Sequence, residues 1–326
     1  LGDPQNWFYF VIAVLFSGFM GVTLWRRKRA IELMIHERNE ALLLNDLKSR
    51  QRWTSLIVMI IAMLSISFSL LNPKWGFHWE EIQRKGADVY GIVNVVGSSI
   101  ARQCGKGVYI HSGPEQSVAS TKAFTNMVGA LALFSLQLGR SRHLSKTKGQ
   151  SIIREMRKLP DKIRTYLENP GPIKEAVDMI IQAKSVLFFG RGISSPVASE
   201  GALKLMEIAY IPCLAYPAGE MKHGPIALID ENYPVVVIAP NDGVQDRTLN
   251  AIHECKARGA KIILIHEEGD PIAEVGDISI AFPSTIPMLT PLLSVLPTQL
   301  IAYHAALALG NDVDRPRNLA KSVTVE

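Results

Sequence analysis

The sequence predicts an α/β protein in which residues 176–310 form a doubly wound, five-stranded parallel sheet and the first 88 residues carry two membrane-spanning helices. Three observations predict this class. Short apolar strand patterns alternate with helical patterns from about residue 89 onward. A strand runs into a glycine-bearing turn and a helix at residues 185–210, as in the first unit of such a sheet. Two long uncharged runs precede them, in a chain that is 48% apolar.

The two uncharged runs are residues 4–25 and 53–73, and each is long enough to cross a hydrocarbon core of roughly 30 Å as a helix. We therefore expect transmembrane helices at about 7–25 and 54–72. A cleavable signal peptide is the alternative for the first run. The basic cluster Arg26–Arg29 argues against it, because it follows the apolar stretch instead of preceding it.

The charge between the two runs predicts the orientation of the chain. Residues 26–52 are rich in Lys and Arg, which the positive-inside rule places in the cytoplasm. The chain would then be anchored in the membrane by its N-terminal segment, with residues 75–326 on the outer side. The net charge of +5 comes largely from this loop and from the basic stretch 140–158. It therefore reflects the membrane orientation of the chain and a solvated surface. Aromatic and basic residues do not interleave, so we expect no nucleic-acid partner.

Residues 89–150 predict an incomplete α/β unit. The apolar run VYGIVNVV is expected to be a buried strand, and residues 121–140 an apolar helix. The amphipathic pattern of residues 150–169 predicts a connecting helix, which the NPGP sequence at 169–172 ends. This stretch holds too few strands to form a doubly wound sheet alone. We interpret 89–150 as a truncated domain and 151–175 as the connection.

The remaining sequence holds every element that a doubly wound sheet needs. Strands and helices alternate, and a long apolar helix closes the unit. The expected strands are 185–192, 212–217, 234–240, 260–266 and 277–282, and the expected helices are 195–210, 219–229, 244–259 and 289–309. Residues 311–326 then form a polar tail with little periodicity, and such tails are usually disordered.

The GRGISSP sequence at 190–196 lies between a strand and a helix start, where free backbone N–H groups favour anions. Glycine and serine are equally common there as turn residues and helix cap. The pattern therefore leaves an anion site and a plain turn as alternatives.

Three ionisable residues of the next helix, Glu200, Lys204 and Glu207, are spaced so that they share one face. One interpretation is a salt-bridge ladder on the surface. The neighbouring Ala, Leu, Met and Ile residues favour another, in which the helix is buried all round and the carboxylates are held in a site. Spacing alone leaves both open.

Further candidates come from the KHG sequence and from the tail. His223, preceded by Glu220 and Lys222, stands near an expected helix start, where a structural role is more common than catalysis. The tail could fold back and deliver Lys321 into a pocket. The three cysteines have no metal-ligand spacing and no CxxC pair, so we expect no metal site and reduced thiols.

Five longer motifs carry a family resemblance: GIVNVVGSSIAR, GPEQSVASTKAFT, SEGALKLMEIAYI, AGEMKHGPIALID and LIAYHAALALGNDVDRPRNLAKSVTVE. From about residue 89 to Glu326 the chain resembles the isomerase half of glutamine:fructose-6-phosphate aminotransferases. The resemblance implies two sugar-isomerase (SIS) domains, a homodimer formed through them, no cofactor, and a cytoplasmic parent family. It also implies conversion of fructose 6-phosphate and ammonia into glucosamine 6-phosphate.

The same resemblance implies roles for individual residues. His223 matches the histidine that opens the sugar ring across the dimer interface. Glu207 matches the glutamate that moves a proton between C1 and C2, assisted by Lys204, and Lys321 the lysine that forms a Schiff base with the open-chain ketose. The implied substrate contacts are Val96, Ser98 and Ala320.

The departures from the family pattern concern phosphate binding. A Cys-Gly-Thr-Ser-type turn and a Ser-Gln-Ser-Gly-Glu-Thr loop, which hold the sugar phosphate in the family, do not occur in this sequence. We expect the first SIS domain to be truncated and the glutaminase domain to be absent. Residues 1–88, with the sequence LNPKWGFHWEEIQRKGADV, resemble instead the start of membrane-anchored von Willebrand type A domain proteins.

Two functions therefore compete. One is an isomerase-type enzyme of the aminotransferase family. The other is an inactive, membrane-tethered or chimeric SIS module that at most binds a sugar phosphate.

Overall fold

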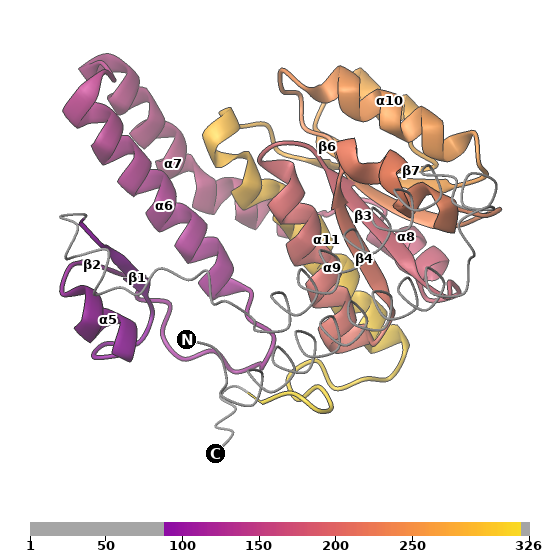
Figure 1. Cartoon of the computed structure of the whole chain (residues 1–326), viewed down its shortest axis with the longest axis horizontal. Helices are drawn as coiled ribbons and strands as arrows, with labels where there is room; N and C mark the ends of the chain where they lie inside the picture. Colours follow the sequence, from indigo (N-terminus) through magenta and orange to yellow (C-terminus); the bar gives the residue numbers. More distant parts are fainter. Residues whose placement is uncertain (1–87, 321–326) are drawn as a thin grey trace, which may run out of the picture. The chain divides into compact units, whose positions relative to one another are not determined.

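Five apolar stretches form one parallel sheet in the computed structural model, which describes residues 88–320 (Figure 1). The strands lie in the order β4-β3-β5-β6-β7, and every neighbouring pair is parallel. Their bounds are β3 Val186–Gly190, β4 Cys213–Pro217, β5 Pro234–Ile238, β6 Lys261–Glu267 and β7 Ile278–Phe282. The predicted five-stranded parallel sheet is confirmed. The predicted transmembrane helices at 7–25 and 54–72, and the segment that resembles von Willebrand proteins, lie outside the described residues.

Helices cover both faces of this sheet, because successive strand side chains point to opposite sides. Phe188 and Val236 pack with α8, α9 and α11, whereas Leu187 and Val235 pack with α10 on the other face. The bounds of these helices are α8 Ile173–Ile180, α9 Ser194–Ala209, α10 Gln245–Lys256 and α11 Thr290–Ala308. The strands are therefore buried on both faces, which explains their nearly continuous apolar sequences.

Before this sheet lies a smaller α/β unit followed by a long helical hairpin (Figure 1). The predicted strand at 89–96 pairs only over three residues, in a two-stranded parallel sheet. The elements are β1 Gly91–Val93, α5 Ser99–Cys104, β2 Gly107–Tyr109, α6 Lys122–Arg142 and α7 Lys146–Glu168. Both predicted helices of this region are confirmed, and α7 begins four residues earlier than expected, where Ser145 caps it.

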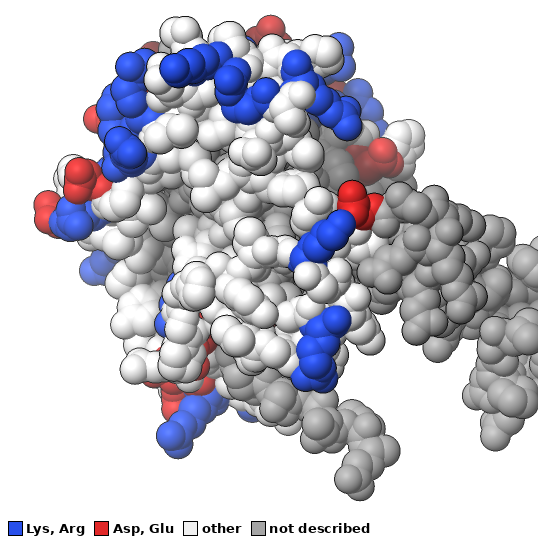
Figure 2. All heavy atoms as spheres, turned by 90° about the vertical axis from the view of Figure 1, so that its left-hand side faces the viewer, with Lys and Arg blue, Asp and Glu red and all other residues white. Residues whose placement is uncertain are grey.

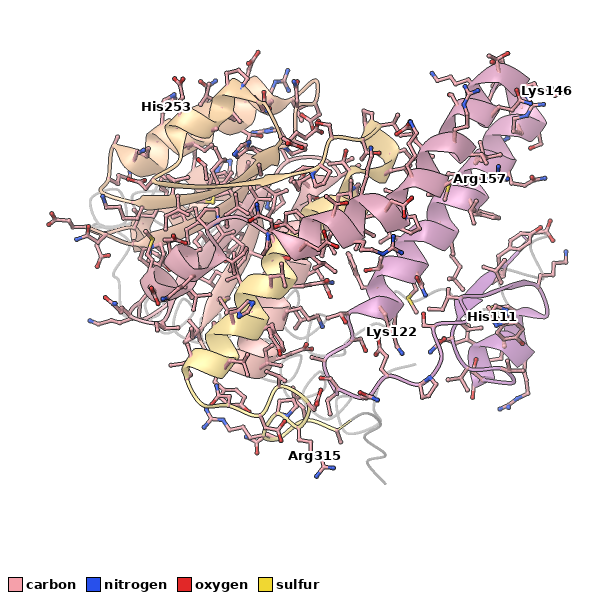
Figure 3. All side chains as sticks on the ribbon, turned by 180° about the vertical axis from the view of Figure 1, so that it is seen from behind. His111, Lys122, Lys146, Arg157, His253 and Arg315 are labelled. Carbon is pink, nitrogen blue, oxygen red and sulfur yellow. The ribbon has the colours of Figure 1, made fainter. Side chains whose placement is uncertain are left out.

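The basic stretch predicted to be solvated lies on the α6–α7 hairpin. Figure 2 shows Lys and Arg side chains gathered at the top of the face that this hairpin forms. Lys146 and Arg157 are among them and point outward (Figure 3). The exposed Lys and Arg residues of the stretch 140–158 are Arg140, Arg142, Lys146, Lys148, Arg154, Arg157 and Lys158.

One helix in the described part of the chain, Pro287–Ala308, is long and apolar enough to cross a membrane. Most of its apolar window is buried inside the protein, and it packs against α9 and α8. Such burial is typical of the core helix of a globular unit.

The segment predicted as one short helix at 219–229 forms two 3₁₀ helices instead. They are η2 Ala218–His223 and η3 Pro225–Leu228. Between them Gly224 has a φ of 143°, which is outside the range of any right-handed helix. The single-helix prediction was wrong because Gly224 turns the chain and Pro225 starts a new helix.

Gly201 sets how closely α9 approaches α11, and this predicts a measurable effect. A Cβ atom at Gly201 would lie 2.7 Å from Cβ of Thr298, which is closer than two carbon atoms can pack. We expect Gly201→Ala to lower the free energy of unfolding by about 1–3 kcal/mol through overpacking. The measurement is chemical denaturation of residues 89–326, followed by circular dichroism.

Gly129, in the middle of α6, is the matched control because a Cβ atom there would meet nothing within 4 Å. Gly129→Ala should leave stability unchanged or raise it by up to about 1 kcal/mol, through helix propensity. If both substitutions change the free energy of unfolding by the same amount, Gly201 is not needed for the close packing of α9 against α11.

Candidate functional site

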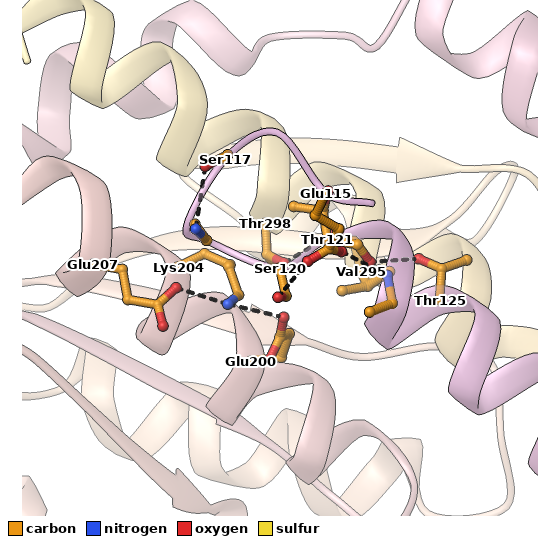
Figure 4. A network of polar contacts seen from close by, with 12 residues as sticks. Glu115, Ser117, Ser120, Thr121, Thr125, Glu200, Lys204, Glu207, Val295 and Thr298 are labelled. Atoms are coloured by element: carbon orange, nitrogen blue, oxygen red, sulfur yellow. Dashed lines mark hydrogen bonds and ion pairs between the residues drawn. The ribbon is translucent and has the colours of Figure 1, made fainter. Parts of the chain in front are cut away.

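The carboxylates of Glu200 and Glu207 flank the ammonium of Lys204 on one face of α9 (Figure 4). Nζ of Lys204 lies 2.7 Å from Oε2 of Glu207 and 3.5 Å from Oε1 of Glu200. The side chains of Lys204 and Glu200 are only 5% and 11% exposed, and that of Glu207 is 22% exposed. The predicted shared face is confirmed, and its burial rules out a solvated surface ladder.

The prediction that α9 is buried all round was wrong. Leu203 and Met206 are exposed, and Pro196 and Ser199 continue the same stripe toward the start of the helix. The sheet and α11 cover only part of the helix circumference, so apolar composition alone did not identify the open side.

A segment that precedes α6 lies opposite this cluster, and it supplies a third carboxylate. Glu115 accepts hydrogen bonds from the backbone N–H of Ala123, at 2.9 Å, and from Oγ of Ser120 (Figure 4). These bonds fix Glu115 at the start of α6, where the helix dipole favours a negative charge. Sequence reasoning missed Glu115. The available signal was an acidic residue among Ser and Thr just before an expected helix.

The carboxyl group of Glu200 holds its proton more firmly than usual. Burial is the main cause and raises its pKa, while Lys204 acts in the opposite direction. The negative charges of Glu207 and Glu115 raise the pKa further. Oε1 of Glu200 has no hydrogen bond among the described residues, so its ionised form is supported mainly by Lys204.

The raised pKa of Glu200 predicts how stability changes with pH. The folded state binds the Glu200 proton more tightly than the unfolded state, so this group lowers stability as pH rises from the ordinary value of 4.5 through the folded pKa. Below that window both states are protonated and the effect vanishes. We expect Glu200→Gln to remove this decrease, so that wild type and variant diverge as pH rises.

Denaturation midpoints of wild type and Glu200→Gln, measured from pH 4 to pH 8, test whether Glu200 lowers stability as pH rises. The difference between the two curves isolates Glu200 from the other titrating groups. A wild type that gains stability over the variant with rising pH would contradict a raised pKa.

The C-terminal tail docks at the C-terminal end of α9. Nδ2 of Asn311 donates to the carbonyl of Ile208 at 3.1 Å, near the C-terminal end of the helix. Oγ of Ser117 donates to the carbonyl of Val313 at 2.9 Å. The tail from Asn311 to Val313 is therefore held between α9 and the segment before α6, and Arg315 points away from the body of the protein (Figure 3). Lys321 lies outside the described residues.

Other predicted site residues lie elsewhere. His223 is exposed in η2, and no hydrogen bond or ion pair of the described residues joins it to the α9 cluster. Its neighbour Lys222 pairs with Glu254 of α10 at 2.7 Å, and Glu220 is exposed. The structure therefore does not bring the three ionisable residues of the KHG segment together with Glu207.

The three predicted substrate contacts lie in two places, with Val96 and Ser98 near the start of α5 and Ala320 in the tail. Val96 is 72% exposed, in the loop after β1. Ser98 caps α5, and its Oγ accepts a hydrogen bond from the N–H of Ala101 at 3.3 Å. Ala320 is exposed at the end of the docked tail.

The GRGISSP sequence makes the turn from β3 into α9. A Cβ atom at Gly190 would lie 2.5 Å from the carbonyl oxygen of Ser194, and Gly192 has a φ of 58°. Both positions need glycine for the turn itself. Tight turn geometry thus explains the glycines without a ligand.

All three cysteines are free and buried. Burial raises the pKa of the Cys213 thiol to about 12 and that of the Cys255 thiol to about 11. The thiolate form that reacts with oxidants and metals is therefore disfavoured.

Comparison with known proteins agrees with this architecture. Residues 179–309 match the model of the SIS domain family. A glutamine–fructose-6-phosphate aminotransferase (isomerizing) of Thermus thermophilus is 50% identical over 248 residues, which are 76% of this chain and 41% of that protein. That of Bacteroides thetaiotaomicron is 49% identical over 249 residues, which are 76% of this chain and 41% of that protein. The chain thus spans about two fifths of the length of these curated relatives.

Two solved structures share this fold. Glucosamine-6-phosphate deaminase from Thermotoga maritima shares the fold, with a TM-score of 0.55 at 19% identity, covering 79% of this chain and 72% of that one. The C-terminal domain of glucosamine-fructose-6-phosphate aminotransferase from Francisella tularensis has a TM-score of 0.64 at 33% identity, covering 73% of this chain and 69% of that one. The chain belongs to the SIS-domain family of the glutamine–fructose-6-phosphate aminotransferases and corresponds to their C-terminal part.

Proposed function

We propose that the α9 face is an isomerase-type site for fructose 6-phosphate in its open-chain form. One observation carries this proposal: a Glu207–Lys204 pair at 2.7 Å, with Lys204 buried and Glu207 partly buried, on a helix whose end is contacted by the C-terminal tail. A partly buried carboxylate that faces a single cation suits the transfer of a proton between adjacent carbon atoms. Family membership supplies the substrate class.

Each group then has a chemical task. The Glu207 carboxylate takes a proton from C1 of the open-chain sugar and returns it at C2. Lys204 orients the Glu207 carboxylate through a charge-assisted hydrogen bond. The amine of Lys321 adds to the sugar carbonyl, and water leaves, giving the Schiff base that makes the neighbouring C–H acidic.

His223 fits a ring-opening role only if it serves a second subunit. It is exposed in η2 and has no described contact with the α9 cluster of its own chain. Its exposure supports a homodimer in which each His223 reaches the partner's sugar.

Titration of residues 89–326 with fructose 6-phosphate, followed by amide chemical shifts, tests the site. Shifts should concentrate at Lys204, Glu207 and the tail, whereas His253 on the far face of α10 should not move. Fructose without phosphate is the ligand control, and it should bind more weakly. Shifts confined to α10, or none at any soluble concentration of fructose 6-phosphate, would end the proposal.

A second candidate is a SIS module that binds a sugar phosphate without turning it over. The sequence lacks both loops that hold the phosphate in the family, and this observation favours the second candidate. Anchoring of such a module by the predicted spans at 7–25 and 54–72 belongs to the same proposal. Binding is common to both candidates, and turnover distinguishes them.

A further inference from the structure

Tyr210 ends α9 in a conformation that an aromatic residue rarely adopts. Its φ and ψ are 60° and 23°, in the left-handed region where helices usually place glycine. Such a conformation costs energy and persists where the surroundings fix it. A glycine would relieve the strain, but it would remove the side chain, so the contacts of that side chain are the feature to explain.

The hydroxyl and the aromatic ring of Tyr210 both contact the C-terminal tail. Oη accepts a hydrogen bond from the backbone N–H of Arg317 at 2.8 Å. The guanidinium of Arg317 lies over the ring, 4.2 Å from its centroid. The two contacts join positions 107 residues apart in the sequence, so they fix the path of the tail where it leaves the end of α9.

This anchor lies next to the candidate site. Tyr210 follows Glu207 by less than one helical turn, and the tail is also bound on its other side. There the N–H of Val118 donates to the carbonyl of Asp314 at 3.1 Å. The tail therefore joins the Glu207 end of α9 to the segment that carries Glu115.

We propose that Tyr210 is a positioning residue, which latches the C-terminal tail at Arg317 beside the Glu207 end of α9. Tyr210 does not itself touch the sugar. That the latch serves sugar binding rests on the proposed function. The latch itself can be measured without any sugar.

Hydrogen exchange of the Val118 amide in the full chain reports the latch, because this amide contacts the tail and not Tyr210. Tyr210→Ala removes both contacts, and we expect Val118 exchange to accelerate on the order of 20-fold. Tyr210→Phe keeps the ring under the guanidinium and loses the hydrogen bond, so the expected acceleration is about fivefold. The Ala239 amide, bonded to Ile265 in the central sheet, should exchange at the same rate in all three proteins.

Two results would overturn the latch. Val118 exchange that is unchanged in Tyr210→Ala shows that the tail is held without Tyr210. Equal acceleration at Val118 and Ala239 shows that Tyr210 serves general stability only. If Tyr210→Ala does not fold, Arg317→Ala and Arg317→Lys test the same contact from the tail, with greater Val118 exchange expected for the alanine variant.

Fructose 6-phosphate titration of the same proteins separates the latch from the proposed function. If the latch serves the site, Tyr210→Ala should bind the sugar phosphate more weakly than wild type, and Tyr210→Phe should restore part of the affinity. Equal affinity of all three, with Val118 exchange accelerated, overturns the positioning role. A wild type that binds no sugar phosphate, yet loses the latch on substitution, leaves Tyr210 as the tail anchor and refutes the proposed function alone.

Discussion

Purified residues 89–326 are expected to make no glucosamine 6-phosphate from fructose 6-phosphate and ammonia beyond the amount made by a Lys321→Ala control. A phosphate dianion bound without its usual serine and threonine donors loses several charge-assisted hydrogen bonds. Each is worth about 1.5–3 kcal/mol, so the substrate should bind orders of magnitude more weakly than in a complete site. Loss of the phosphate contacts also frees C1 and C2 of the sugar to move relative to Glu207, which costs about a further hundredfold in rate.

A coupled assay for glucosamine 6-phosphate, run at saturating ammonia, measures this directly. Lys321→Ala is the matched control, because it removes the expected Schiff-base amine and leaves the described unit unchanged. Turnover that is well above the control, and that disappears with Lys321→Ala, would contradict the prediction. It would mean that another part of this protein supplies the phosphate donors.

Replacing Lys204 with methionine should produce the largest loss of stability among single substitutions at the site. The substitution leaves Glu200 and Glu207 without their cation in a place where Glu200 is 11% exposed. Breaking a buried ion pair by removing one partner costs about 3 kcal/mol or more, since the remaining charge has neither water nor a counter-ion. The loss should shrink at low pH, where the carboxyl groups take up protons.

Lys158→Met is the control, because the ammonium of Lys158 also lies 2.6 Å from a carboxylate, that of Glu155, but its side chain is 61% exposed. Exposed pairs of this kind contribute little, so its denaturation midpoint should stay near that of wild type. Chemical denaturation of both variants at pH 7 and pH 4.5 measures the two losses of stability and their dependence on pH. Similar midpoints for the two variants would show that the α9 charges are solvated.

Local spacing was sufficient to predict much of this protein. The apolar strands and the helices between them follow from periodicity, because side chains on a strand or helix repeat at fixed intervals. The shared face of Glu200, Lys204 and Glu207 follows from the same geometry. The charge of residues 140–158 also predicted a solvated stretch, since Lys and Arg side chains are rarely buried without partners.

Contacts between distant segments could be known only from the tertiary structure. The proximity of Glu115 to Glu200 depends on how the segment before α6 packs beside α9, and the tail contacts Tyr210 and Ser117. Local sequence does not encode the distance between such segments, because packing of the whole unit sets it. The open side of α9 at Leu203 and Met206 was missed for the same reason. Sequence determined which residues share a face, and the fold decided what each face meets.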